Sequence, residues 1–245
     1  MKKSFCKLNV LALSVAAPCL LSAARAQTSV TVLNNSFQLQ PQSENQTTVL
    51  TPNGPTDWTG FNAGSGGSYD IGLSGENGSD YTVGPLAAPA SGNSYLWINR
   101  FNGNGTQVAG IYQDVGSLLA DTTYTLSVAI GQRAGAGPNG SWSPGIISLL
   151  NGTDNTGAIM ATGGGLSSTP NTWEDFTTSF TTGASVSGDL TIELSVLDAP
   201  SIQADFSNVE LTATSVPEPG AFAMFGGGLA LLWLVVRRRK QAAVN

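Results

Sequence analysis

The side chains of this sequence that could carry out catalysis are almost all carboxylates. The 245 residues include no histidine, which excludes Ser-His-Asp triads, His-ligated zinc and imidazole acid–base chemistry. No glycine-rich loop lies between a strand and a helix, so the pattern that binds nucleotide phosphates has no support. Paired carboxylates are therefore the remaining route to catalysis.

The positions of the acids do not single out such a pair. Four acids share one loop-rich stretch and could converge in a cleft: Asp57, Asp70, Glu76 and Asp80. Glu174 and Asp175 are adjacent, so on a strand they would point to opposite faces. Acids in loops are usually solvated surface groups. The sequence therefore identifies no catalytic residue.

Tryptophans are the second group of interest, because a sugar ring stacks well on an indole face. Trp142 lies in a loop between two Pro- and Gly-containing turns, and Trp58 lies in the loop Asp57-Trp58-Thr59-Gly60. We predict Trp142 first and Trp58 second as ligand contacts, with burial against the end of the domain as the alternative. Trp97 and Trp173 alternate with polar residues inside strands, so we expect both in the core.

Charge is distributed very unevenly along the chain. Residues 27–215 hold fifteen of the sixteen acids but only two of the ten basic residues, Arg100 and Arg133, which gives this segment a net charge of 2 − 15 = −13. Such a surface repels nucleic acid and anionic lipid, and it suits metal cations or neutral ligands such as sugars. Plain solubility outside the cell is the alternative explanation. Either arginine could donate hydrogen bonds to a sugar or pair with a nearby acid.

The first 26 residues have the plan of a secretory signal peptide. Three lysines precede the apolar run Leu8–Leu21, and Ala24-Arg25-Ala26 is a small-x-small cleavage site. Signal peptidase would cut after Ala26, and both cysteines, Cys6 and Cys19, would leave with the peptide. The mature domain would then contain no thiol and no disulfide. A lipoprotein signal ending at Cys19 is the alternative, but the proline before it fits poorly.

The last 30 residues, 216–245, combine a proline-rich hinge, an apolar run and a basic end. The hinge is Val216, Pro217, Glu218 and Pro219; the run is 221–236; and the basic residues are Arg237, Arg238, Arg239 and Lys240. A helix over 221–236 would be about 24 Å long, somewhat less than a hydrocarbon core of about 30 Å, and snorkelling arginines can make up the difference. We predict a transmembrane helix with the basic cluster in the cytoplasm and the domain outside.

This tail resembles the PEP-CTERM sorting signal, which has the same three parts in the same order. The resemblance implies recognition and cleavage by an exosortase, a membrane transpeptidase-like enzyme. It also implies a Gram-negative bacterium that makes an exopolysaccharide matrix. The expected location is therefore the membrane at first and the cell surface or extracellular space after processing. The resemblance implies an address and no particular activity.

The middle of the chain is typical of an all-β protein. Short β-branched and aromatic segments recur between turn clusters, with no long helical periodicity. Ten segments are candidate strands: Val30–Leu33, Ser68–Leu73, Ser94–Asn99, Gly110–Val115, Thr122–Gln132, Gly145–Leu150, Ala158–Thr162, Trp173–Phe180, Leu190–Leu197 and Asp205–Thr212. Alternation within several of them predicts one antiparallel β-sandwich, with Phe206 buried and Asp205 facing out. The predicted organisation is a signal peptide (1–26), a sandwich domain (27–215) and the sorting tail (216–245).

The order of landmarks in this domain resembles the jelly-roll carbohydrate-binding modules of the galactose-binding-like type. The matching segments are Asn34-Asn35-Ser36-Phe37-Gln38, Asp57-Trp58, Tyr95-Leu96-Trp97-Ile98, Ile111–Val115, Leu119–Leu126, Trp173–Phe180 and Asp205–Leu211. The resemblance implies a structural Ca²⁺ where the first strand meets the last, with Asp205 and the residue at Gln38 as ligands. Gln38 departs from the usual Glu there, and its neutral amide would contribute no charge.

These observations favour an exported, non-enzymatic protein of the cell surface or matrix that binds a polysaccharide. Two alternatives stay open: a carboxylate-based enzyme acting on glycans or small molecules, and a purely structural surface protein. Some terpenoid cyclases of cyanobacterial alkaloid pathways share the general β-sandwich plan, but no residue in this sequence marks their chemistry.

Overall fold

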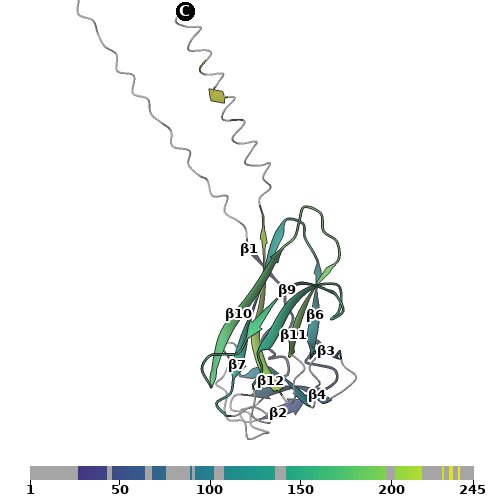
Figure 1. The fold of residues 1–245 in the computed structure, drawn as a ribbon, viewed down its shortest axis with the longest axis vertical. Coiled ribbons are helices and arrows are strands. Elements are labelled where there is room, and N and C mark those ends of the chain that lie inside the picture. Colours follow the sequence, from purple (N-terminus) through teal and green to yellow (C-terminus); the bar gives the residue numbers. More distant parts are fainter. Residues whose placement is uncertain are drawn as a thin grey trace, which may run out of the picture.

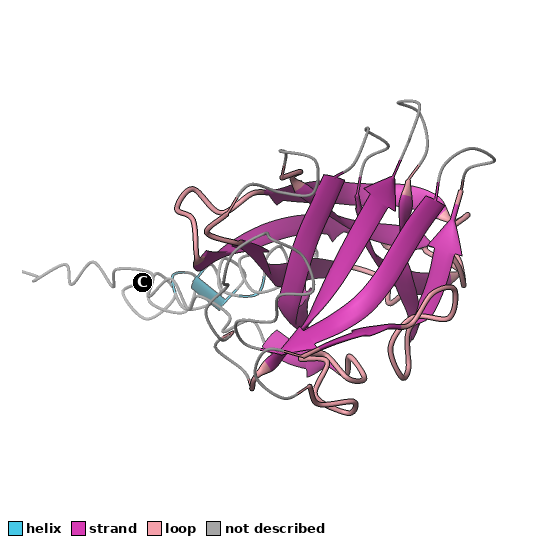
Figure 2. Cartoon of the chain, turned by 90° about the horizontal axis from the view of Figure 1, so that it is seen from below, coloured by secondary structure: helices cyan, strands magenta, loops and turns pink. Residues whose placement is uncertain are grey.

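The computed structural model is an all-β molecule of two stacked sheets (Figures 1 and 2). It describes residues 27–42, 46–63, 68–75, 89, 92–101, 108–135, 142–196 and 202–216, together with residues 228, 232, 233 and 237 of the tail. The strands are β1 (Gln27–Val30), β2 (Thr47–Val49), β3 (Thr59–Asn62), β4 (Ser68–Gly75), β5 (Ser94–Phe101), β6 (Ala109–Ser117), β7 (Thr122–Gln132), β8 (Gly145–Asn151), β9 (Ala158–Gly165), β10 (Thr172–Thr181), β11 (Asp189–Val196) and β12 (Ile202–Ser215).

The strands form two antiparallel sheets. Sheet A has the order β10-β7-β12-β5-β4-β2, and β1 also pairs with β12; sheet B has the order β3-β6-β11-β8-β9. The predicted antiparallel β-sandwich is therefore confirmed. Two short strands, β2 and β3, were not expected, and the first strand lies at Gln27–Val30 rather than at Val30–Leu33.

The core lies between the two sheets and follows from the alternation of apolar and polar residues. Leu126, Val128 and Ile130 of β7 belong to the same core cluster as Ile192 and Leu194 of β11, and all five are fully buried. Their neighbours in sequence point away from this core, because successive side chains of a strand lie on opposite faces.

The segment after β1 is held against the sandwich by one glutamine. The side chain of Gln113 accepts a hydrogen bond from Leu33 N at 2.8 Å, and its Nε2 donates to Leu33 O at 3.0 Å and to Asp57 O at 2.9 Å. The backbone N–H and C=O of Leu33 therefore bond to the Gln113 side chain instead of a neighbouring strand.

Both termini of the sandwich lie at the same end. Gln27 of β1 pairs with Thr214 of β12, so the chain enters and leaves side by side, at the upper end in Figure 1. Among the described residues, no helix is long and apolar enough to cross a membrane. The predicted helix 221–236 and the predicted signal peptide lie almost wholly or wholly outside these residues.

Candidate functional site

The outer face of sheet A carries a row of residues that crosses six strands. Each residue of this row lies directly opposite the next, in the order Val49, Gly72, Trp97, Asp205, Gly131 and Trp173. All of these side chains point away from the core, because Leu73, Leu96, Phe206 and Ile130 beside them point into it. A single carboxylate therefore lies at the middle of the sheet between two tryptophans.

Asp205 is fully buried although it faces away from the core, its side chain having 0% exposure. Its Oδ1 accepts a hydrogen bond from Gln203 Nε2 at 2.7 Å, and its Oδ2 lies 3.5 Å from Arg133 Nε. Burial raises the pKa of the Asp205 carboxyl above its ordinary value, while the Arg133 charge and the Gln203 hydrogen bond act in the opposite direction. Asp205 therefore points away from the core, as predicted, but its side chain is buried and not exposed to solvent.

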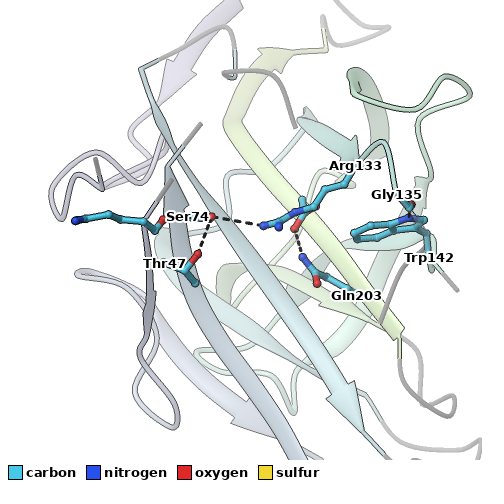
Figure 3. A network of polar contacts seen from close by, with 8 residues as sticks. Thr47, Ser74, Arg133, Gly135, Trp142 and Gln203 are labelled. Atoms are coloured by element: carbon cyan, nitrogen blue, oxygen red, sulfur yellow. Dashed lines mark hydrogen bonds and ion pairs between the residues drawn. The ribbon is translucent and has the colours of Figure 1, made fainter. Parts of the chain in front are cut away.

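The Arg133 side chain extends across the outer face of sheet A towards Ser74 (Figure 3). Its guanidinium carbon lies 5.5 Å from the centre of the Tyr95 ring, and its Nη2 donates to Ser74 Oγ at 3.5 Å. Ser74 in turn lies 3.1 Å from the Thr47 hydroxyl. Burial raises the pKa of the Tyr95 hydroxyl, and the negative charge of Asp205 adds to the increase. The arginine therefore connects a carboxyl and a phenol that come from different strands.

The aromatic rings of Tyr95 and Trp173 also lie on this outer face of sheet A. Tyr95 is on β5 and Trp173 on β10, three strand spacings apart, or about 14 Å between backbones. Their ring centres nevertheless lie 5.4 Å apart in an edge-on arrangement. The two side chains thus reach towards each other across the outer faces of β12 and β7, where Ser207, Ala129 and Gly131 provide little bulk.

Several further polar atoms of this face are buried. Within the described part of the chain, Trp97 Nε1, Asn99 Oδ1 and Ser207 Oγ are buried and have no hydrogen-bond partner. We call the residues of this face the outer-face cluster: Ser74, Tyr95, Trp97, Asn99, Arg133, Trp173, Gln203, Asp205 and Ser207. An unsatisfied buried donor or acceptor costs about 1–3 kcal/mol, so these atoms make the face unfavourable for the stability of the fold.

The sequence of the sandwich domain matches a known protein family. A family described as HpiC1 cyclase matches residues 28–212, about three quarters of the chain. The chain belongs to the HpiC1-like cyclase family. The PEP-CTERM protein-sorting motif matches residues 215–240. This motif identifies an exported protein that is anchored at the membrane before processing, and it implies an exosortase as the processing partner.

Solved structures place this cyclase-family chain among similar sandwiches. The Stig cyclase Fisc from Fischerella sp. TAU, in complex with (3Z)-3-(1-methyl-2-pyrrolidinylidene)-3H-indole, is 19% identical with a TM-score of 0.60, over 78% of this chain and 100% of that one. An apo cyclase from Fischerella sp. is 21% identical with a TM-score of 0.59, over 78% and 98% of the two chains.

A structure titled CBM4 is 16% identical with a TM-score of 0.46, over 75% and 99% of the chains. The likenesses to the two cyclases show a shared fold. No curated protein matches the sequence.

The tryptophans of this cyclase-family chain lie largely where the sequence did not place them. Trp97 and Trp173, expected in the core, lie on the face of sheet A that points away from the core between the sheets. Trp97 is nevertheless buried there, as expected, with 2% exposure. Trp58, expected to contact a ligand, is buried in the core with 4% exposure. Its Nε1 donates to Leu33 O at 3.1 Å and its ring lies 5.8 Å from that of Phe37, so no ring face is open to a ligand.

Trp142 lies at the margin of the outer-face cluster. It is half-buried, and its Nε1 donates to Gly135 O at 2.8 Å (Figure 3). The next residue, Ser143, donates its N–H to Gln203 O at 3.1 Å, which fixes Trp142 beside the start of β12. Its predicted ligand contact stays a prediction, and its position beside Gln203 and Arg133 is compatible with it.

The two predicted calcium ligands use their polar atoms on different partners. Gln38 donates its Nε2 to Ser36 O and Ser94 O, both at 2.8 Å, while Asp205 bonds Gln203 and Arg133. The described residues contain no group of three or more Asp and Glu side chains placed to hold a metal ion. Of the four clustered acids, Glu76 and Asp80 lie outside the described residues.

Proposed function

We propose that this exported protein is a cyclase in which Asp205 transfers a proton to and from a neutral, largely apolar substrate on the outer face of sheet A. The observation that carries the proposal is the fully buried Asp205 carboxyl, whose pKa burial raises, at the centre of a cluster of aromatic side chains. Perturbed carboxyls of this kind are typical of acid–base catalysis. Membership of a cyclase family supports the same chemistry.

The surroundings of Asp205 suit a reaction in which positive charge develops. Protonation of a carbon–carbon or carbon–nitrogen double bond by the carboxyl would leave a cation on the substrate. An internal nucleophile of the substrate would then close the ring, and loss of a proton to the carboxylate would restore both. The faces of Trp97, Tyr95 and Trp173 stabilise a nearby cation, and Tyr95 already contacts the Arg133 guanidinium in this way.

The hydrogen-bonding atoms of the cluster favour a second candidate, the binding of a glycan. Trp97 Nε1, Asn99 Oδ1 and Ser207 Oγ lack partners among the described residues and could bond sugar hydroxyls. Trp142 at the margin offers an indole face. This candidate agrees with the acidic composition of the domain, which suits a neutral ligand such as a sugar. It also agrees with export of the protein. It requires no proton transfer, and that difference separates the two candidates.

The test measures turnover in D₂O with the full-length protein. Indoles that carry an unsaturated side chain serve as probes, because protonation of such a chain leads to ring closure. The wild type should give ring-closed isomers that contain one deuterium, as seen by mass spectrometry. Asp205→Asn should lower the rate by about 10²–10⁴-fold. Asp175→Asn, an exposed acid on the same face of sheet A, should leave the rate unchanged.

Equal rates for Asp205→Asn and the wild type would refute proton transfer by Asp205. If no probe reacts and matrix polysaccharide is retained by the wild type but not by Trp142→Ala, the glycan candidate replaces the cyclase.

A further inference from the structure

The last strand of the sandwich runs almost directly into the sorting motif. β12 ends at Ser215, and the motif's first proline, Pro217, is separated from it by Val216 alone. Val216 is itself held, since its N–H donates to Asp121 O at 2.6 Å. The loop that contains Asp121 is anchored in turn by a bond from Asp121 N to Gly183 O at 3.0 Å. The folded domain therefore leaves no free spacer before the motif.

The end of β12 is hydrogen-bonded on both sides. On one side Leu211–Thr214 pair with β1, Gln27 lying opposite Thr214 and Val30 opposite Leu211. On the other side the same residues pair with β7, up to Ser215 opposite Thr122. Thr28 Oγ1 also donates to Ala213 O at 3.3 Å, and the side chains of Leu211 and Ala213 are buried. We call Gln27–Val30 and Leu211–Thr214 the terminal strand pair.

An enzyme that cuts a peptide usually binds several residues on each side of the bond in an extended conformation, through main-chain hydrogen bonds. Upstream of the motif those main-chain groups already bond to β1 and β7, and one group cannot serve both partners. Pro217 and Pro219 have no N–H to offer. Cleavage near the motif therefore competes with the pairing of β12.

We propose that the exosortase acts on a locally opened form in which the end of β12 has separated from its neighbours, so that the terminal strand pair sets the rate at which the protein is released from the membrane. β1 is the strand that opens first. It has four residues, the first three of which are exposed, whereas β7 has eleven and lies in the middle of the sheet. Short, exposed strands open at low free-energy cost. The inference rests on the sorting motif and not on the proposed catalytic activity.

The test locks the terminal strand pair with a disulfide. Ser29 and Thr212 are directly opposite and point away from the core, at a separation close to what a disulfide spans. The full-length precursor Ser29→Cys/Thr212→Cys is followed by pulse-chase in cells that contain the exosortase, with loss of the tail read as a gel shift. The matched control, Thr123→Cys/Thr181→Cys, links β7 to β10 at the same end. Thr123 lies opposite Thr214 of β12, but the control disulfide does not cross-link β12 to either neighbour.

The Ser29–Thr212 disulfide should slow tail removal at least about tenfold, because it keeps β1 from separating from β12. A tenfold change corresponds to the cost of breaking about one sheet hydrogen bond. Reductant should restore the rate, and the control disulfide should not change it. A six-residue Gly-Ser spacer between Ser215 and Val216 should make processing fast with or without the disulfide. The same insertion after Ala184, in an exposed loop, should have no effect. The proposal is wrong if both disulfide variants are processed at the wild-type rate, or if the spacer fails to restore processing of the locked precursor.

Discussion

Replacing Arg133 tests whether this arginine balances the charge of Asp205. Arg133 and Asp205 side chains are 4% and 0% exposed, with 3.5 Å between Nε and Oδ2. Arg133→Met keeps an unbranched apolar stem and removes the charge. The carboxylate would then be buried without a counter-charge, and breaking a buried ion pair in this way costs about 3–5 kcal/mol. We expect that loss in the free energy of unfolding at pH 8.

The loss should depend on pH in a direction that the structure fixes. Burial raises the pKa of Asp205 in the folded state, and the Arg133 charge opposes the increase, so Arg133→Met raises that pKa further. A carboxyl with a raised folded-state pKa destabilises the fold above that pKa. The penalty disappears as the pH falls and the folded state takes up a proton. The deficit of Arg133→Met should therefore be largest at pH 8 and smaller at pH 5.

The assay is urea unfolding of the wild type, Arg133→Met, Asp205→Asn and the double variant at both pH values. Asp205→Asn removes the charge and keeps the shape, so the double variant should recover about 1–3 kcal/mol relative to Arg133→Met at pH 8. Two strictly additive substitutions, with the same deficit at pH 8 and pH 5, would refute the view that the two charges balance each other.

Two other substitutions test contacts outside the candidate site. Gln113→Ala removes three hydrogen bonds to Leu33 and Asp57 and should lower the free energy of unfolding by about 2–4 kcal/mol in urea titrations. The control Gln46→Ala, at an exposed position, should change this free energy little. A loss for Gln113→Ala no larger than that of the control would contradict the role of Gln113. Glu193 lies on the outer face of sheet B, where Ser195 Oγ donates a hydrogen bond to its Oε1 at 2.9 Å. Burial raises the pKa of the Glu193 carboxyl in the folded state. Wild-type stability should therefore increase as the pH falls from 8 through this raised pKa. Glu193→Gln should remove that part of the increase and be more stable than wild type at pH 8, and parallel plots of melting temperature against pH would contradict this.

The strands could be predicted to the extent that alternation is visible along the chain. Thr122–Gln132 was expected as a strand and is β7 with the same bounds, because its apolar residues recur at every second position. β2 and β3 have three and four residues and are too short to show a period. They are strands because β4 and β6 offer them free edges, which a local pattern cannot indicate.

The site was less predictable than the fold, because its parts come from distant segments. Alternation gives the face on which Asp205 lies, but the covering rings are Tyr95 and Trp173, and their contact depends on which strands become neighbours. The same limit applies to Trp97. Its alternation with polar residues predicts a strand, yet it does not say which face is the core. The bare backbone at Gly72 decides where the indole lies, since a Cβ there would be 2.3 Å from Trp97 Cζ2.

The outer-face cluster is also an unfavourable arrangement if stability is the only consideration. A buried ion pair can often be replaced by apolar side chains without loss of stability, and each unsatisfied polar atom carries a further cost. The cluster contains a buried ion pair and, among the described residues, buried polar atoms without hydrogen-bond partners. Both lie on the face of sheet A that points away from the core. The sandwich already has a continuous core of Leu, Ile, Val and Phe side chains between its sheets. Stability therefore does not account for the cluster, and this agrees with the proposal that the outer face of sheet A binds a ligand at the Asp205 carboxyl.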